Sequence, residues 1–166
     1  MTRTLAGLCL LLLSAPALAQ PETVYFESRD GKTTIVGYLF KPSAAPPHPA
    51  VVLLHGRSGP YSLAGNGDCT LVAPTVASPC NAASLSKRHA MWGQYWADRG
   101  YLALLADSFG PRGKAHGYGR FTHGDADRDD VDEKTVRPLD AEGALDYLRG
   151  RGIKIINVQS DECFPD

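Results

Sequence analysis

The sequence predicts an α/β fold with a partial sheet, in which two hairpin strands precede parallel strands that alternate with two helices. Two observations favour this fold class. An Asp-Gly turn separates two early strand-like runs, and two later apolar runs flank a stretch with helical spacing. With 166 residues, 43% of them hydrophobic, the chain suits one globular domain.

The first predicted element is a hairpin that joins Val24–Ser28 to Thr33–Lys41. Its connection, Arg29-Asp30-Gly31-Lys32, places Asp-Gly at the centre, and both residues tolerate a positive φ. The segment Pro42–Pro49 contains four prolines and is predicted to be a connector, because proline has no N–H to donate to a sheet.

The run Ala50–Leu54 is predicted to be a central parallel strand, buried on both faces, because four aliphatic residues stand in a row within it. His55 and Gly56 follow at its carboxyl end, where α/β proteins place their chemistry. The next segment, Arg57–Ala83, is rich in Gly, Ser, Pro and Asn, so a surface insertion is expected.

Lys87–Arg99 is predicted to be a helix that ends at Gly100, and Tyr101–Ala106 a second parallel strand that leads into Asp107. The apolar residues at helical spacing in this helix are Met91, Tyr95 and Trp96.

Pro111–Lys134 is predicted to be a glycine-rich loop that becomes acidic and mobile. Val136–Arg151 is predicted to be an amphipathic helix that ends at Gly150 and Gly152, and Ile153–Val158 is a further strand-like run. The apolar face of this helix is expected to contain Leu139, Ala141, Ala144, Leu145 and Leu148.

Residues 1–19 are predicted to be a secretory signal peptide, because a positive start precedes the apolar run Leu5–Leu13 and Ala17-Leu18-Ala19 forms a cleavage site. An N-terminal anchor helix is the alternative. The mature chain is expected to start at Gln20, to be periplasmic or secreted, and to have no membrane contact after cleavage.

Export suggests an oxidising compartment, in which Cys69 and Cys80 are expected to form a disulfide across the insertion, with two free thiols as the alternative. Cys163 is then an exposed free thiol. The net charge of −1 and scattered Lys and Arg argue against nucleic-acid binding. No cofactor is expected.

The acidic stretch starts like a calcium loop at Asp125-x-Asp127-x-Asp129, but two key positions differ. Asp130 stands where the sharp turn needs glycine, and Val136 stands where a bidentate glutamate belongs. No metal site is predicted there.

The order of several segments resembles the dienelactone hydrolase family, which has the α/β-hydrolase fold. The resemblance covers residues 23–152. The segments that carry it are Gly37–Pro42, Pro49–Gly59, the helix through Trp96 to Gly100, Tyr101–Gly113 (with Ala-Asp-Ser-Phe-Gly-Pro-Arg-Gly) and Arg137–Leu148 (starting Arg-Pro-Leu-Asp-Ala).

The resemblance implies hydrolysis of a small ester or lactone by a nucleophile, a histidine and an acid. The turn His55-Gly56-Arg57 matches the family's oxyanion-side loop, so the N–H of Arg57 is the candidate oxyanion donor. The residues expected to contact the substrate are Arg57, Ser58, Asp107 and Phe109. Asp107 has an equal alternative, which is to cap the turn that follows it.

The catalytic residues themselves are missing, because the sequence contains no G-x-S-x-G. Ser160 follows a strand-like run, but Val158 and Glu162 occupy the positions that need glycine. The histidines are expected to be surface or loop residues; they are His48, His55, His89, His116 and His123.

The sequence therefore predicts the N-terminal part of a hydrolase domain over residues 20–152, truncated before its nucleophile elbow, and a non-family tail over residues 153–166. The chain is expected to be inactive alone, with poor stability or association through the unpaired sheet edge. The alternative is a non-catalytic exported module that binds a small molecule between the loops Arg57–Ala83 and Gly110–Lys134.

Overall fold

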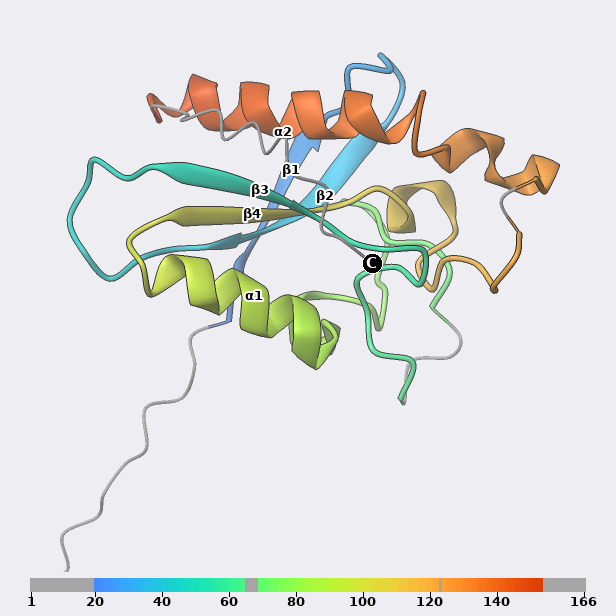
Figure 1. Cartoon of the computed structure of the whole chain (residues 1–166), viewed down its shortest axis with the longest axis horizontal. Coiled ribbons are helices and arrows are strands. Elements are labelled where there is room, and N and C mark those ends of the chain that lie inside the picture. Colours follow the sequence, from blue (N-terminus) through green and yellow to red (C-terminus); the bar gives the residue numbers. More distant parts are fainter. Residues whose placement is uncertain (1–19, 65–68, 123, 154–166) are drawn as a thin grey trace, which may run out of the picture.

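The computed structural model describes residues 20–64, 69–122 and 124–153 (Figure 1). The predicted signal peptide, Ser160, Cys163 and most of the strand-like run after the second long helix lie outside these residues. The elements are β1 (Glu22–Glu27), β2 (Thr34–Phe40), β3 (Ala50–Leu54), the 3₁₀ helix η1 (Ala82–Ser84), α1 (Lys87–Ala97), β4 (Leu102–Asp107), the 3₁₀ helices η2 (Gly110–Arg112) and η3 (Ala126–Val131), and α2 (Arg137–Gly150).

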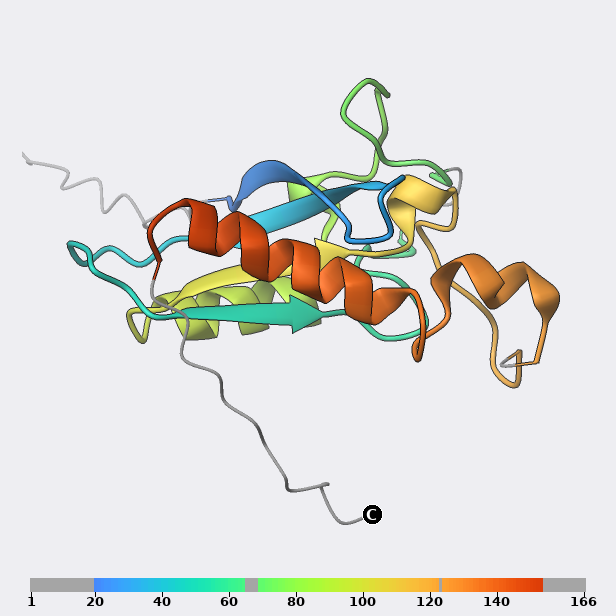
Figure 2. The same cartoon turned by 90° about the horizontal axis from the view of Figure 1, so that it is seen from above.

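The strands form one mixed sheet in the order β1-β2-β4-β3. β1 and β2 are antiparallel, β2 and β4 are antiparallel, and β3 and β4 are parallel. The helices α1 and α2 cover opposite faces of this sheet (Figures 1 and 2). The prediction of an α/β fold with two main helices is confirmed at this level.

The predicted hairpin is also confirmed, with Glu27 opposite Thr34 at its closed end. Gly31 has a φ of +72°, which glycine adopts without strain. The Asp30 carboxylate accepts hydrogen bonds from the backbone N–H groups of Lys32 and Thr33, both at 2.9 Å. These contacts fix the turn that the Asp-Gly pair predicted.

The prediction that Ala50–Leu54 is the central, doubly buried strand is wrong for the described sheet. β3 is an edge strand that pairs with β4 alone among the described residues. Residues 51–53 are half-buried, and the Leu54 side chain is 48% exposed. The inner strands of the described sheet are β2 and β4, and Ala103 and Leu104 of β4 are completely buried. An apolar run signals a parallel strand, but it does not give the position of that strand in the sheet.

The core consists of two layers, one on each face of the sheet. Under α1, side chains of β2 and β4 pack with the segment before α1; this layer includes Tyr38, Phe40, Leu105, Leu85 and Ala97. Under α2, the alternate residues of the same strands pack with Ala144 and Leu148. The period of two along the strands produces this division.

The buried faces of both helices differ from those predicted. Met91 is 56% exposed, and α1 instead buries Gly93 and Ala97. A Cβ at Gly93 would collide with the Phe40 ring, so the missing side chain lets α1 approach β2 closely. In α2, Ala144 and Leu148 are buried as expected, but the rest of the buried face is Asp140 and Gly143.

The segment Arg57–Ala83 is not simply a surface insertion, because several of its side chains enter the core under α1. Those side chains are Tyr61, Cys69, Val72 and Cys80, each at most 6% exposed. A bridge between Tyr61 and Leu85 attaches the segment to the residues just before α1. The prediction failed because the Gly, Ser and Pro content outweighed these few buried residues.

The acidic stretch is likewise more ordered than predicted. Residues 126–131 form η3, in which Val131 is completely buried and Arg128 is 6% exposed. The Arg128 guanidinium lies over the Tyr118 ring, 5.0 Å from its centroid.

Within residues 20–64, 69–122 and 124–153, no helix has the length and apolar character needed to cross a membrane.

Candidate functional site: the turn after β3

The turn after β3 lies where the carboxyl ends of β3 and β4 meet, and His55 joins the two. The His55 side chain is buried, and its Nε2 accepts a hydrogen bond from the Ser108 backbone N–H at 3.1 Å. Since that N–H can only donate, Nε2 carries no proton, and Nδ1 donates to the Gly56 carbonyl at 2.8 Å. Burial lowers the pKa of His55 to about 3. His55 is therefore a neutral structural link rather than the loop histidine that was predicted.

The same tautomer explains a close contact between His55 and Asp107. Nε2 lies 3.6 Å from the Asp107 carboxylate, a separation that would suit an ion pair if the ring were charged. Because the ring is neutral and Nε2 is already occupied by Ser108, this contact is not a salt bridge.

The residues that follow form a tight turn. Gly59 has a φ of +70° and donates its N–H to the Gly56 carbonyl at 3.2 Å. Gly56 and Ser58 are exposed, and Arg57 is half-buried. Within the described chain, the Arg57 N–H meets no hydrogen-bond acceptor. The structure thus leaves available the N–H that the sequence suggested as an oxyanion donor.

A second loop fixes this turn from the side. The Tyr118 N–H donates to the Arg57 carbonyl at 2.8 Å, and the Arg57 guanidinium donates back to the Tyr118 carbonyl at 2.9 Å. A Cβ at Gly59 would collide with the Ala115 carbonyl, and one at Gly117 would collide with the Arg57 carbonyl. Only glycine permits so close an approach of the two backbones.

Arg137, the first residue of α2, was not predicted to belong to this site. Its Nη2 donates to the His55 carbonyl, and its guanidinium carbon lies 5.2 Å from the Phe109 ring centroid. Its buried Nε has no hydrogen-bond partner among the described residues. Burial lowers the pKa of Arg137. An arginine at the start of a helix is too common a pattern to have revealed this contact.

The structure places Asp107 and Phe109 behind the turn, and both are completely buried. Asp107 Oδ1 accepts hydrogen bonds from the backbone N–H groups of Phe109 at 3.0 Å and Gly110 at 2.8 Å. Of the two roles weighed for Asp107, the structure therefore shows the cap. In this conformation neither side chain offers a surface to a ligand, so their contact with a substrate remains a prediction without geometric support.

Asp107 is also the end of a buried chain of hydroxyl groups. The Tyr61 hydroxyl donates to Asp107 Oδ2 at 2.7 Å, and the Tyr38 hydroxyl lies 2.6 Å from that of Tyr61. Burial raises the pKa of Asp107 to about 6 and that of both tyrosines above their usual range. This chain connects β2, the segment after β3 and the end of β4.

A buried ionic cluster lies on the α2 side of the same loops. The Arg112 guanidinium donates two hydrogen bonds to Asp140 of α2 and one to Asp30 of the hairpin turn, all at 2.9 Å, and one to the Ser108 carbonyl at 2.7 Å. The Arg112 side chain is 8% exposed and that of Asp140 is 0% exposed. Sequence reasoning missed this cluster because its three residues are far apart in the chain.

The Ser86 hydroxyl contacts His89, but the proton on the contacting ring nitrogen prevents the pair from acting as a nucleophile and its base. His89 Nδ1 lies 2.8 Å from the Ser86 hydroxyl and 3.0 Å from the Pro60 carbonyl. Because a carbonyl only accepts, Nδ1 carries a proton and cannot take one from Ser86. Ser86 also caps α1, so its role is structural. His48 is half-buried in the proline-rich connector, and His123 and Ser160 lie outside the described residues.

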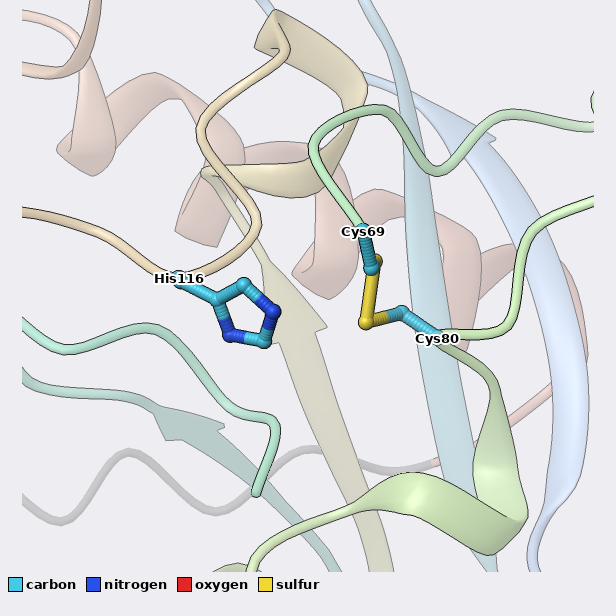
Figure 3. Close-up of side chains that lie close together, drawn as sticks. All are labelled: Cys69, Cys80 and His116. Carbon is cyan, nitrogen blue, oxygen red and sulfur yellow. A yellow bond between two sulfur atoms is a disulfide. The ribbon is translucent and has the colours of Figure 1, made fainter. Parts of the chain in front are cut away.

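The structure joins Cys69 and Cys80, the predicted pair, in a disulfide. His116 lies beside it, and its ring points toward the two sulfurs (Figure 3). One ring nitrogen of His116 and both sulfurs lie within 4.8 Å of one another. The sulfurs of an intact disulfide are not thiolates, so in this state the three residues do not form a metal site.

Comparison with known proteins identifies no family for this chain, since no family model matches the sequence and no curated protein matches it.

Proposed function

We propose that this chain carries the oxyanion-side turn of an exported, dienelactone-hydrolase-like enzyme that acts on small esters or lactones. The observation that carries the proposal is the Arg57 N–H, which has no acceptor among the described residues although its turn is fixed on both sides. A fixed N–H of this kind stabilises the oxyanion of acyl transfer without rearrangement during the reaction. Arg137 adds a positive charge beside the turn.

The sheet supports the same proposal. A hairpin precedes parallel strands, and the turn lies at the carboxyl end of one of them, as the resemblance implies. The remaining strands of an α/β-hydrolase sheet, including the strand with the nucleophile, would extend the sheet from the free edge of β3. Export rests on the signal-like character of residues 1–19.

We further propose that the described residues alone do not catalyse hydrolysis. His55 is neutral, buried and bonded through both ring nitrogens. His89 Nδ1 already carries a proton, so it cannot take one from Ser86, the serine that it contacts. Asp107 is fully engaged as a cap. In this arrangement neither His55 nor Asp107 can serve as the base or acid of a triad, and His89 cannot activate Ser86.

Two measurements on the full chain test this proposal. Titration with methylphosphonate, an oxyanion mimic, should shift the Arg57 amide resonance in a saturable way. The Gly100 amide, which precedes β4 at the opposite end of the sheet, should not move. Hydrolysis of p-nitrophenyl acetate should stay at the buffer rate, and a serine-directed fluorophosphonate should not label the chain. An unmoved Arg57 resonance contradicts the oxyanion role, and strong labelling at Ser160 contradicts the incomplete site.

The alternative, a non-catalytic binding module, is favoured by one specific observation. A cavity of about 580 Å³ lies along α1, within the range of small-molecule sites. Phe40, Leu85, Ala90 and Met91 contribute to its lining, so it lies away from the facing loops where the sequence suggested a pocket. Saturable binding of an apolar fluorescent probe, abolished by Ala90→Trp but not by Leu63→Trp at an exposed position, would support this function.

A further inference from the structure

The two cysteines of the disulfide, when reduced, and the neighbouring histidine have donor atoms that suit a metal ion. We propose that, once the Cys69–Cys80 disulfide is reduced, the chain binds one Zn²⁺ ion through the two cysteine sulfurs and His116. Two thiolates and an imidazole are the ligands that zinc prefers. The proposal does not depend on the hydrolase function, because it rests on a different set of residues.

The positions of the three donors carry this inference. In the oxidised chain, both sulfurs and one His116 nitrogen already lie within 4.8 Å of one another. Tetrahedral zinc with bonds of about 2.3 Å to sulfur holds two thiolates about 3.8 Å apart. Breaking the disulfide therefore requires a small separation of the sulfurs by side-chain rotation, while the histidine is already at a suitable distance.

The backbone around each donor is fixed by its own hydrogen bonds. The Ala115 N–H donates to the Thr70 carbonyl at 2.9 Å, which attaches the residue before His116 to the residue after Cys69. The Cys80 N–H contacts the Ser78 hydroxyl at 3.3 Å. These contacts do not involve the disulfide, so reduction leaves the three residues close together, and little ordering is needed for a metal to bind.

Burial and charge favour the metal-bound state of the reduced chain. Both cysteines are at most 2% exposed, so two thiolates without a counter-charge would be costly there. A divalent cation neutralises them. His116 is half-buried, so the site is not completely closed off from solvent. The Ser78 hydroxyl, 3.4 Å from the Cys69 sulfur, can donate to a thiolate.

The chemistry balances in two steps. A phosphine reductant and one water molecule break the S–S bond; the phosphine becomes its oxide, and each sulfur receives a proton. Zn²⁺ then forms bonds to both sulfurs and to one His116 nitrogen, and the two thiol protons leave to solvent. A water molecule can occupy the fourth position, as it does in zinc sites with three protein ligands.

The test uses Co²⁺ as a spectroscopic substitute for Zn²⁺ and the full chain with Cys9→Ser and Cys163→Ser, which removes the other two thiols. After phosphine reduction without oxygen, Co²⁺ should produce a thiolate-to-metal charge-transfer band and visible d–d bands of tetrahedral cobalt, saturating at one ion per chain. Zn²⁺ should displace the cobalt, and two protons should be released per ion bound. The oxidised chain should show none of these bands.

Variants identify the ligands. His116→Ala should weaken Co²⁺ binding at least about tenfold, since removing even a residue that only hydrogen-bonds to a metal ligand lowers metal affinity by about that factor. His48→Ala, in the proline-rich connector, should leave the affinity unchanged. Absence of a thiolate band in the reduced parent chain would refute the proposal, whatever the stability of the variants. Equal affinities of the His116→Ala and parent chains would refute the role of the histidine.

Discussion

The buried cluster of Arg112, Asp30 and Asp140 gives the most specific stability prediction. Replacing Arg112 with methionine keeps much of the side-chain volume but removes all four hydrogen bonds that its guanidinium donates. Asp140 then remains completely buried without its bidentate partner. Removing one member of a buried ion pair costs about 3–5 kcal/mol. We expect the free energy of unfolding of Arg112→Met to fall by about that amount.

The chain contains a matched control for this experiment. Arg29 also connects the hairpin turn to α2, with a bidentate contact to Asp146 at 2.7 and 2.9 Å and a further contact to Glu142 at 3.1 Å. Its side chain is 48% exposed, so water replaces these contacts when they are lost. Arg29→Met should therefore reduce stability much less than Arg112→Met, although the partners and the connected elements are similar.

The assay is urea unfolding followed by circular dichroism, with the disulfide intact in all variants. The double variant Arg112→Met/Asp140→Leu should recover much of the lost stability, because it removes the unpaired buried carboxylate as well. Similar losses for Arg29→Met and Arg112→Met would refute the argument that burial sets the cost. No recovery in the double variant would show that the unpaired Asp140 is not its source.

Three further predictions concern the core and the loops. Because burial raises the pKa of Asp107 to about 6, above its unfolded value, the contribution of Asp107 to stability should fall by roughly 2–3 kcal/mol as pH rises from about 4 to about 6. His55, whose pKa burial lowers to about 3, acts in the opposite direction over this range, so the test is the stability of the parent chain relative to Asp107→Asn, which should fall by that amount in urea titrations at several pH values. Tyr61→Phe should cost about 1–3 kcal/mol in the same assay, because it removes a hydrogen bond to a buried carboxylate. Gly143→Ala should cost about 1–3 kcal/mol, because its Cβ would collide with the Glu27 carbonyl where α2 meets β1, whereas Gly150→Ala at the open end of α2 should have little effect on the melting temperature.

Much of the fold could be predicted from local sequence patterns. The Asp-Gly turn specified the hairpin, and the strand–helix–strand succession specified the parallel pair of β3 and β4. The order of strands could not be predicted in the same way, because β3 and β4 carry equally apolar sequences. Position in the sheet depends on which edges are paired, and a run such as Ala50–Leu54 contains no information on that point.

The site was predicted less completely, for a related reason. The turn from His55 to Ser58 is continuous in sequence and was identified, but the groups that hold it come from remote positions. Tyr118 and Arg137 reach the turn across 61 and 82 residues, respectively. Neither has a local pattern that distinguishes it from other tyrosines and arginines. A carboxylate at the end of a strand can either contact a ligand or cap the turn that follows. The cap was therefore one of the two roles predicted for Asp107.

The groups that hold the turn after β3 also bear on whether it can exist without further strands. His55 is bonded to Ser108, Arg57 to Tyr118, and the His55 carbonyl to Arg137, so the contacts come from the end of β4, the loop at Tyr118 and the first residue of α2. None of them involves the free edge of β3. The turn is therefore organised by β4, α2 and the loop at Tyr118, and strands added at that edge would meet the Arg57 N–H, the proposed oxyanion donor, already in place.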